Sequence, residues 1–165
     1  MKRLYLLRHA KADWSVDVTH DRHRPLEERG RKDAARVGRL LANLGQVPEV
    51  VLSSPAVRAE TTARIAIESG AWGKEPSIVE DLYDTPAWKV FRAVGQQPDE
   101  IQSVLVAFHE PTCSETLGEL VGQADVRMPT AALARVDLPI ESWQDTGPGA
   151  GMLVWLVTPK ILKAR

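Results

Sequence analysis

Short apolar runs alternate with longer stretches of helical periodicity along this chain. Runs of this length are typical of buried β-strands. They fall at residues 4–7, 50–52, 78–79, 103–108, 131–138 and 152–157. Between the first five runs, apolar residues recur three and four positions apart, which predicts helices. The helices are expected at 27–44, from 54–55 to 69–70, around 88–94, and from 112 or 114 through 121.

Small polar residues next to prolines mark where the predicted helices begin. A serine or threonine can cap the first free amide groups of a helix, and a proline suits the first helical turn. Gly45 is expected to end the first helix. The expected capping positions are Ser54 before Pro55, Thr85 before Pro86, and Thr112 or Ser114.

Strands and helices alternate over most of the chain, and two strands follow one another at its end. This order predicts a three-layer α/β/α fold with a mostly parallel central sheet and helices on both faces. The last two strands are expected to form a hairpin around a turn at 145–149, giving the sheet an antiparallel edge. The length of 165 residues fits a single domain over 1–165, with a solvated basic tail from about Lys160.

Composition narrows the classes of protein that need to be considered. The 21 Lys and Arg residues nearly balance the 22 Asp and Glu residues, which argues against a generic nucleic-acid binder. The single cysteine, Cys113, excludes an internal disulfide and any zinc site with two cysteine ligands. No apolar run is long enough for a signal peptide or a membrane span. The expectation is a cytoplasmic protein with no nucleic-acid or membrane partner.

Chemically active residues follow the first four predicted strands. The carboxyl ends of parallel strands meet at one edge of a sheet, where α/β proteins bind their ligands. The residues concerned are Arg8 and His9 after the first strand, Arg58 after the second, Glu80 and Asp81 after the third, and His109 after the fourth.

This set of side chains suits phosphoryl transfer. Arginine guanidinium groups bind phosphate through paired hydrogen bonds and stay charged. One histidine can attack phosphorus while the second donates hydrogen bonds to the phosphoryl oxygens. A carboxylic acid could protonate the leaving group. The sequence has no phosphate-binding Walker loop and no evident carboxylate cluster for magnesium. It therefore predicts phosphoryl transfer through a phosphohistidine, without metal or cofactor.

Two motifs carry a resemblance to a known family. Residues 6–10 (LLRHA) and 54–62 (SPAVRAETT) resemble the histidine phosphatase superfamily, which includes the phosphoglycerate mutases. Residues 7–14 (LRHAKADW), followed by Arg24-Pro25-Leu26 and Gly30, are similar to the SixA-type phosphohistidine phosphatases. The resemblance extends from Lys2 to about Val157. It implies a phosphoglycerate mutase-like fold without the large insertions of the mutases.

The resemblance also implies roles for individual residues. His9 corresponds to the nucleophile, and Arg8, Arg58 and His109 correspond to the groups that bind the phosphoryl group. Arg24 lies where SixA-type proteins have an arginine near the mouth of the site. Asp81, with Glu80 beside it, is the nearest match to the general acid of larger relatives. The implied substrate is phosphohistidine on a protein, such as a histidine phosphotransfer domain.

Two residues depart from the family pattern. Phe108 and Glu110 flank His109 where the family usually has glycine and asparagine. A phenylalanine implies different packing, and a glutamate could weaken phosphate binding. They leave open a non-catalytic module that binds phosphate or phosphoproteins. A phosphatase acting on small phosphate esters is the alternative with the same chemistry. A dinucleotide-binding domain is disfavoured because no GxGxxG motif follows the first strand.

Three further features have an ordinary structural interpretation. His20, Asp21 and His23 could bind a metal, but their short spacing in a polar stretch favours a solvated loop. Cys113 is expected to be a small packed residue instead of a nucleophile. Trp14 could form a wall of the site or simply pack against the chain.

Overall fold

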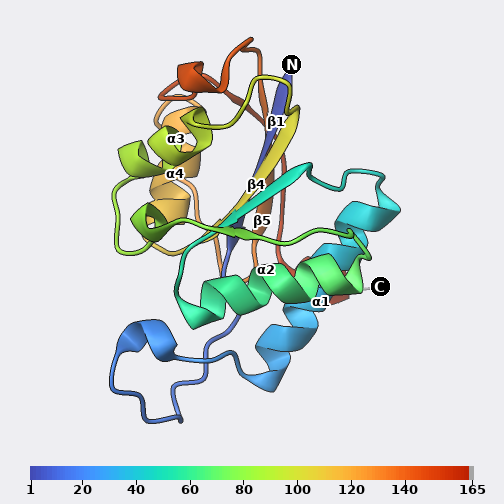
Figure 1. The fold of residues 1–165 in the computed structure, drawn as a ribbon, viewed down its shortest axis with the longest axis vertical. Helices are drawn as coiled ribbons and strands as arrows, with labels where there is room; N and C mark the ends of the chain where they lie inside the picture. The colour runs from blue at the N-terminus through green and yellow to red at the C-terminus, as the bar shows by residue number, and fades with distance from the viewer. Residues whose placement is uncertain (164–165) are drawn as a thin grey trace.

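A computed structural model describes residues 1–163 of the chain, and it contains one six-stranded sheet (Figure 1). The spatial order of the strands is β3-β2-β4-β1-β5-β6. The pairs β3–β2, β2–β4 and β4–β1 are parallel, while β1–β5 and β5–β6 are antiparallel. The strands are β1 (Lys2–Arg8), β2 (Val50–Ser53), β3 (Ser77–Ile78), β4 (Ser103–Phe108), β5 (Leu133–Leu138) and β6 (Met152–Val157).

Helices cover both faces of the sheet. Helices α1 and α2 lie together on one face, and α3 and α4 lie together on the other (Figure 1). A short α5 follows β6, and three 3-10 turns lie in the connecting loops. The bounds are α1 (Glu28–Asn43), α2 (Val57–Ser69), α3 (Ala87–Gly95), α4 (Thr112–Leu120), α5 (Pro159–Lys163), η1 (Asp21–His23), η2 (Glu80–Leu82) and η3 (Trp143–Asp145).

Alternating side chains of the central strands separate two cores. Leu4 and Leu6 of β1 pack into the core under α3 and α4, whereas Tyr5 and Leu7 pack into the core under α1 and α2. All six residues of β4 are buried. Burial of both faces explains why this strand reads as an unbroken apolar run. The predicted three-layer fold, its mostly parallel sheet and its antiparallel hairpin edge are confirmed.

The N-cap residues of helices α2, α3 and α4 differ from the predicted capping residues. Helix α2 begins after Ala56, α3 after Pro86 and α4 after Pro111, and within residues 1–163 none of these starts has a side-chain cap from its N-cap residue. The predicted capping side chains have other partners or none. The hydroxyl of Ser54 contacts His109, that of Thr112 bonds to the Thr85 carbonyl, and that of Thr85 has no hydrogen-bond partner within 1–163.

The described basic residues at the C-terminal end, Lys160 and Lys163, are exposed and belong to a short helix. The described part of the expected basic tail forms α5, and Lys163 Nζ lies 3.0 Å from a carboxylate oxygen of Asp33 on α1. Ion pairing to a buried carboxylate gives this segment a fixed place on the molecule. The last two positions of the predicted tail, 164–165, lie outside the described residues.

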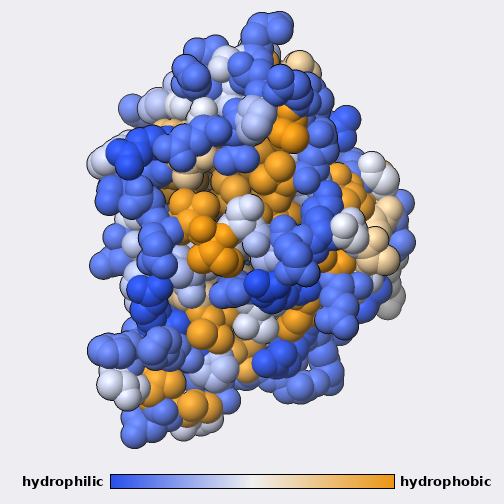
Figure 2. Space-filling model, viewed as in Figure 1, coloured by the Kyte–Doolittle hydropathy of each residue, from blue (hydrophilic) through white to orange (hydrophobic). Residues whose placement is uncertain are grey.

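Most large apolar side chains are buried, but several reach the surface. Figure 2 shows apolar residues gathered near the middle of the viewed face, with polar residues around its margin. Three consecutive exposed residues, Met152, Leu153 and Val154, belong to β6 at the open edge of the sheet. No helix within residues 1–163 is long and apolar enough to cross a membrane.

Candidate active site

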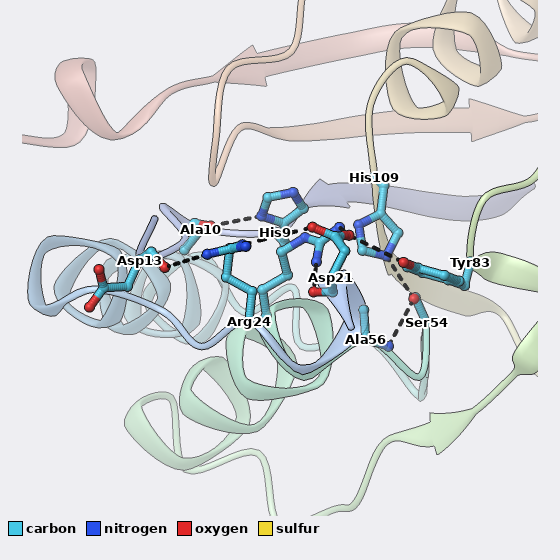
Figure 3. A network of polar contacts seen from close by, with 10 residues as sticks. His9, Ala10, Asp13, Asp21, Arg24, Ser54, Ala56, Tyr83 and His109 are labelled. Carbon is cyan, nitrogen blue, oxygen red and sulfur yellow. Dashed lines mark hydrogen bonds and ion pairs between the residues drawn. The ribbon is translucent and has the colours of Figure 1, made fainter. Parts of the chain in front are cut away.

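Two histidines meet at the carboxyl ends of the central strands. Arg8 ends β1 and Phe108 ends β4, and these two residues are register partners in the parallel pair. His9 and His109 follow them directly, and their ring centroids are 5.2 Å apart (Figure 3). The backbone amide of His9 donates to the carbonyl of Phe108, which holds the two strand ends together. The parallel sheet therefore sets the spacing of the pair.

His9 is held in one orientation. Its Nδ1 lies 2.8 Å from the backbone carbonyl of Ala10. A carbonyl can only accept a hydrogen bond, so Nδ1 carries the proton and Nε2 keeps its lone pair. The pKa of His9 is lowered to about 4, chiefly by burial; the bond to Ala10 opposes this shift, and the charges of Arg58 and Arg8 add to it. His9 is therefore neutral near pH 7, the state that a nucleophile requires.

His109 shares this buried environment but has different partners. Its Nε2 lies 2.7 Å from the hydroxyl of Ser54, and the ring of Tyr83 packs edge-on against it at 5.5 Å. Its Nδ1 is buried and has no hydrogen-bond partner within residues 1–163. Burial, and then the neighbouring His9 and Arg58, lower the pKa of His109 to about 3. The ring is therefore neutral, with one nitrogen available to a ligand.

Arg8 supplies a cation at the foot of the site. Its Nη1 donates to the carbonyl of Met128 at 3.0 Å, while its buried Nε has no partner in the described part of the chain. A buried N–H group without an acceptor is unfavourable unless a ligand or water accepts from it. His109 likewise has one buried nitrogen without a partner within residues 1–163.

Arg58 lies in the first turn of α2 and is bound by a carboxylate. Its Nη2 is 2.9 Å from a carboxylate oxygen of Asp21, and its Nη1 donates to the Asp21 carbonyl at 3.0 Å. The hydroxyl of Tyr83 donates to the same carboxylate at 3.2 Å. Burial alone would raise the pKa of Asp21, but the hydrogen bonds from Arg58 and Tyr83 and the charges of Arg58 and Arg24 outweigh it and lower the pKa. An ionised carboxylate thus lies beside one of the expected phosphate ligands (Figure 3).

The sequence did not single out this carboxylate for a role at the site. Asp21 lies in a polar stretch with His20 and His23, where the sequence gives no periodic signal. In the structure the stretch forms η1, which folds back over the start of α2. His20 and His23 are exposed with their rings 5.7 Å apart, and residues 1–163 contain no group of three or more His, Cys, Asp or Glu side chains suited to a metal ion.

Arg24 supports the loop in front of the site. Its Nη1 donates to the carbonyls of Asp13 and Val16 at 3.1 Å each, and its guanidinium lies 4.1 Å from the centre of the Trp14 ring. Its Nε is 3.8 Å from a carboxylate oxygen of Asp21. The Trp14 side chain is 67% exposed, so the tryptophan covers the arginine from the solvent side. Arg24 is near the site, but its charge is partly used to hold the loop.

The acidic pair after β3 faces other elements. A carboxylate oxygen of Asp81 accepts from Arg92 of α3 at 3.1 Å, and Lys89 lies 3.9 Å away. Glu80 pairs with Arg22 at 3.3 Å. No hydrogen bond or ion pair within residues 1–163 joins either carboxylate to His9 or His109. The structure thus brings Asp21 beside the expected phosphate ligands and places Asp81 against α3.

The two departures from the family pattern have structural explanations. The Phe108 side chain is fully buried in the core under α3 and α4. The Glu110 carboxylate accepts from the backbone amide of Ser114 at 2.7 Å and from its hydroxyl at 2.6 Å, and so caps α4. Cys113 is fully buried, and burial raises the pKa of its thiol well above the usual value, which makes it a poor nucleophile.

The fold and the site define the class of protein. A mostly parallel α/β sheet ends here in two neutral histidines and an arginine with an unpartnered buried N–H group, a set of groups that suits an anion. The comparisons with known proteins agree. The histidine phosphatase superfamily (branch 1) model matches residues 4–132, and the chain belongs to this family.

Individual relatives extend the similarity over nearly the whole chain. An uncharacterised protein of Mycobacterium tuberculosis is 31% identical, over 93% of this chain and all of its own. The histidine phosphatase SixA bound to tungstate has a TM-score of 0.85 and 26% identity, covering 98% of this chain and 99% of that one. A protein of Agrobacterium tumefaciens assigned as phosphohistidine phosphatase SixA has a TM-score of 0.81 and 27% identity, covering 96% and 98%. The fold is therefore phosphoglycerate mutase-like.

Proposed function

We propose that this protein is a metal-independent phosphatase that works through a phosphohistidine on His9, and that its substrate is phosphohistidine on a protein. The observation that carries the proposal is the state of His9. The imidazole is neutral, its Nδ1–H is bonded to the Ala10 carbonyl, and its Nε2 lone pair remains for attack. His109 and Arg8 each contribute a buried nitrogen without a partner in residues 1–163.

The reaction has two steps. In the first, Nε2 of His9 forms a bond to phosphorus while the bond between phosphorus and the leaving group breaks. Arg8, Arg58 and His109 bind the phosphoryl oxygens, whose charge they stabilise as the bonds change. In the second step a water molecule attacks phosphorus, the bond to His9 breaks, and orthophosphate leaves. Arg24 contributes at the mouth of the site by holding the loop that carries Trp14.

A phosphoramidate substrate suits the carboxylates of this site. An alkoxide leaving group needs a strong proton donor, whereas an imidazole leaves readily once it is protonated. Asp21 is ionised, and Asp81 and Glu80 pair with cations of other elements. The similarity to SixA structures supports the same substrate class. A histidine phosphotransfer domain is the kind of partner that would present such a group.

Small phosphate esters are the alternative substrates for the same two steps. They would require Asp81, or Glu80 beside it, to turn toward the leaving group. The non-catalytic phosphate-binding module is the second alternative, although Phe108 lies in the core and the Glu110 carboxylate is bonded to the start of α4.

Turnover in the presence of EDTA tests the proposal. The substrates are a histidine phosphotransfer domain phosphorylated on histidine, and p-nitrophenyl phosphate. The expected result is metal-free hydrolysis that His9→Ala abolishes, with the protein substrate strongly preferred. His20→Ala is the matched control, because His20 is exposed and lies in the loop outside the histidine pair. Rapid quenching should trap an acid-labile, base-stable phosphoryl group on the wild type but not on His9→Ala.

Three results would overturn the proposed mechanism, activity or substrate. Hydrolysis that persists in His9→Ala would exclude the phosphohistidine mechanism. A folded wild type that binds tungstate but hydrolyses neither substrate would instead identify a phosphate-binding module. Preference for p-nitrophenyl phosphate over the phosphorylated protein would favour the small-ester alternative.

A further inference from the structure

Ser54 lies behind His109, on the side of the ring that faces away from the free nitrogen. It follows the last residue of β2 and is fully buried. Its hydroxyl lies 2.7 Å from Nε2 of His109, and the backbone amide of Ala56 donates to the same hydroxyl oxygen at 3.2 Å (Figure 3). The serine thus joins the loop after β2 to the histidine after β4.

The hydrogen-bond inventory favours one arrangement of protons. An amide nitrogen can only donate, so the Ser54 oxygen accepts from Ala56. The hydroxyl has a single proton, and its one other close partner within residues 1–163 is Nε2 of His109. If the hydroxyl donates to Nε2, the serine proton has an acceptor, and Nδ1 of His109 is the one atom of this pair left without a partner within residues 1–163. The reverse direction would leave the hydroxyl proton buried without one, which is unfavourable.

The direction of this bond fixes the tautomer of His109. A neutral imidazole carries its proton on one nitrogen only, so acceptance at Nε2 places the proton on Nδ1. Nδ1 is the buried atom that lacks a protein partner. With a proton it donates to a phosphoryl oxygen. In the other tautomer it would present a lone pair to an anion, which is repulsive.

We propose that Ser54 is a positioning residue that keeps His109 in the Nδ1–H tautomer, so that the ring donates a hydrogen bond to the transferring phosphoryl group. The catalytic consequence of this assignment rests on the proposed function. The tautomer itself is a property of the resting protein and can be measured without any substrate. The low pKa of His109 agrees with a ring that relies on one correctly placed proton instead of a positive charge.

The chain provides a matched control for Ser54. Ser53 is also a fully buried serine, and its hydroxyl donates to the carbonyl of Ser54 at 2.9 Å. Within residues 1–163 the Ser53 side chain has no hydrogen bond to either histidine. Ser53→Ala and Ser54→Ala therefore remove the same group from adjacent buried positions, and only the second removes the partner of His109.

The test combines imidazole nitrogen NMR with kinetics. At pH 7 the wild type should show His109 with a protonated Nδ1 and an unprotonated Nε2. Ser54→Ala should show signal from the other tautomer, and Ser53→Ala should match the wild type. The kcat for p-nitrophenyl phosphate or the phosphorylated protein should fall about tenfold in Ser54→Ala, less than the effect of deleting a whole transition-state donor. Ser53→Ala should change kcat less than twofold.

The outcomes separate this inference from the proposed function. A wild type with the proton on Nε2 overturns the inference whether or not the protein is active, and so does a Ser54→Ala protein with unchanged tautomer and kcat. Equal losses of kcat in both serine variants would indicate a general packing effect and also overturn it. If the expected tautomers are found in a protein without turnover, the tautomer assignment is confirmed and the proposed phosphatase activity is refuted.

Discussion

The carboxylate of Asp21 provides the most informative perturbation of the site. Asp21→Asn removes one negative charge next to Arg58 and keeps the size of the side chain. The backbone carbonyl of Asp21 still accepts from Nη1 of Arg58, so the guanidinium keeps one of its two contacts. The variant therefore tests the effect of the Asp21 charge more than the position of the Arg58 guanidinium. The natural probe is tungstate, a dianion that resembles phosphate.

The expected effect follows from two opposing contributions. A carboxylate and a dianion separated by about 6 Å repel by about 1–3 kcal/mol at effective dielectric constants of about 80 to 40. The Asp21 side chain is 47% exposed, so solvent screening favours the lower end of this range. Loss of the ion pair that orients Arg58 opposes the gain by about 0.5 kcal/mol. Binding of tungstate should therefore strengthen by about twofold to fivefold.

Isothermal titration calorimetry at low and high salt measures this effect. The gain should shrink at about 0.5 M salt, because added ions screen the repulsion. Asp17→Asn is the control, since Asp17 is an exposed aspartate of the same loop. Weaker tungstate binding by Asp21→Asn would refute the reasoning. It would mean that Asp21 acts chiefly by orienting Arg58, or that its carboxylate shares a proton with the bound anion.

Three further predictions address packing, protonation and the general acid. Gly38→Ala should destabilise the protein by about 2–4 kcal/mol in urea unfolding, because a Cβ at this position would collide with the backbone of α2; an unchanged midpoint would show that the two helices can separate easily. His9 and His109 have folded-state pKa values of about 4 and about 3, below the value of 6.5 expected when unfolded, so the unfolded chain binds protons first. The free energy of unfolding should therefore be largest above about pH 6.5 and fall by several kcal/mol as the pH drops toward 4, and a His9→Gln variant should show a shallower decline. Asp81→Asn should change hydrolysis of a phosphorylated protein by less than about threefold, since imidazole leaves without a strong acid; a large loss confined to phosphate esters would instead identify Asp81 as their proton donor.

The sequence alone was sufficient for the architecture. Apolar runs separated by helical periodicity predicted the strands, and the unbroken run at 103–108 marked the strand buried on both faces. Strand order then placed Arg8, His9 and His109 at one edge of the sheet, because parallel strands end together. These features depend on local pattern and chain order, which a single sequence records.

Only the tertiary structure decided how polar side chains are paired. Ser54 has the sequence context of a helix cap, but its hydroxyl is taken by His109, a residue 55 positions away along the chain. Asp21 is paired with Arg58 across a separation of 37 residues. A side chain with several available partners is satisfied by whichever the packed fold brings nearest, and that choice has no periodic signature.

The dependence of polar pairing on the packed fold also explains the different positions of Asp81 and Asp21. In the sequence, Asp81 follows a strand, which predicts a place beside the histidines, while Asp21 lies in a polar stretch without a periodic pattern. In the folded chain, the Asp81 carboxylate pairs with Arg92 of α3, whereas η1 places the Asp21 carboxylate beside the start of α2. Hydrophobic pattern determines which elements form and how they are layered, because burial of apolar surface drives their assembly. The partner of each charged group is determined only after those elements have packed.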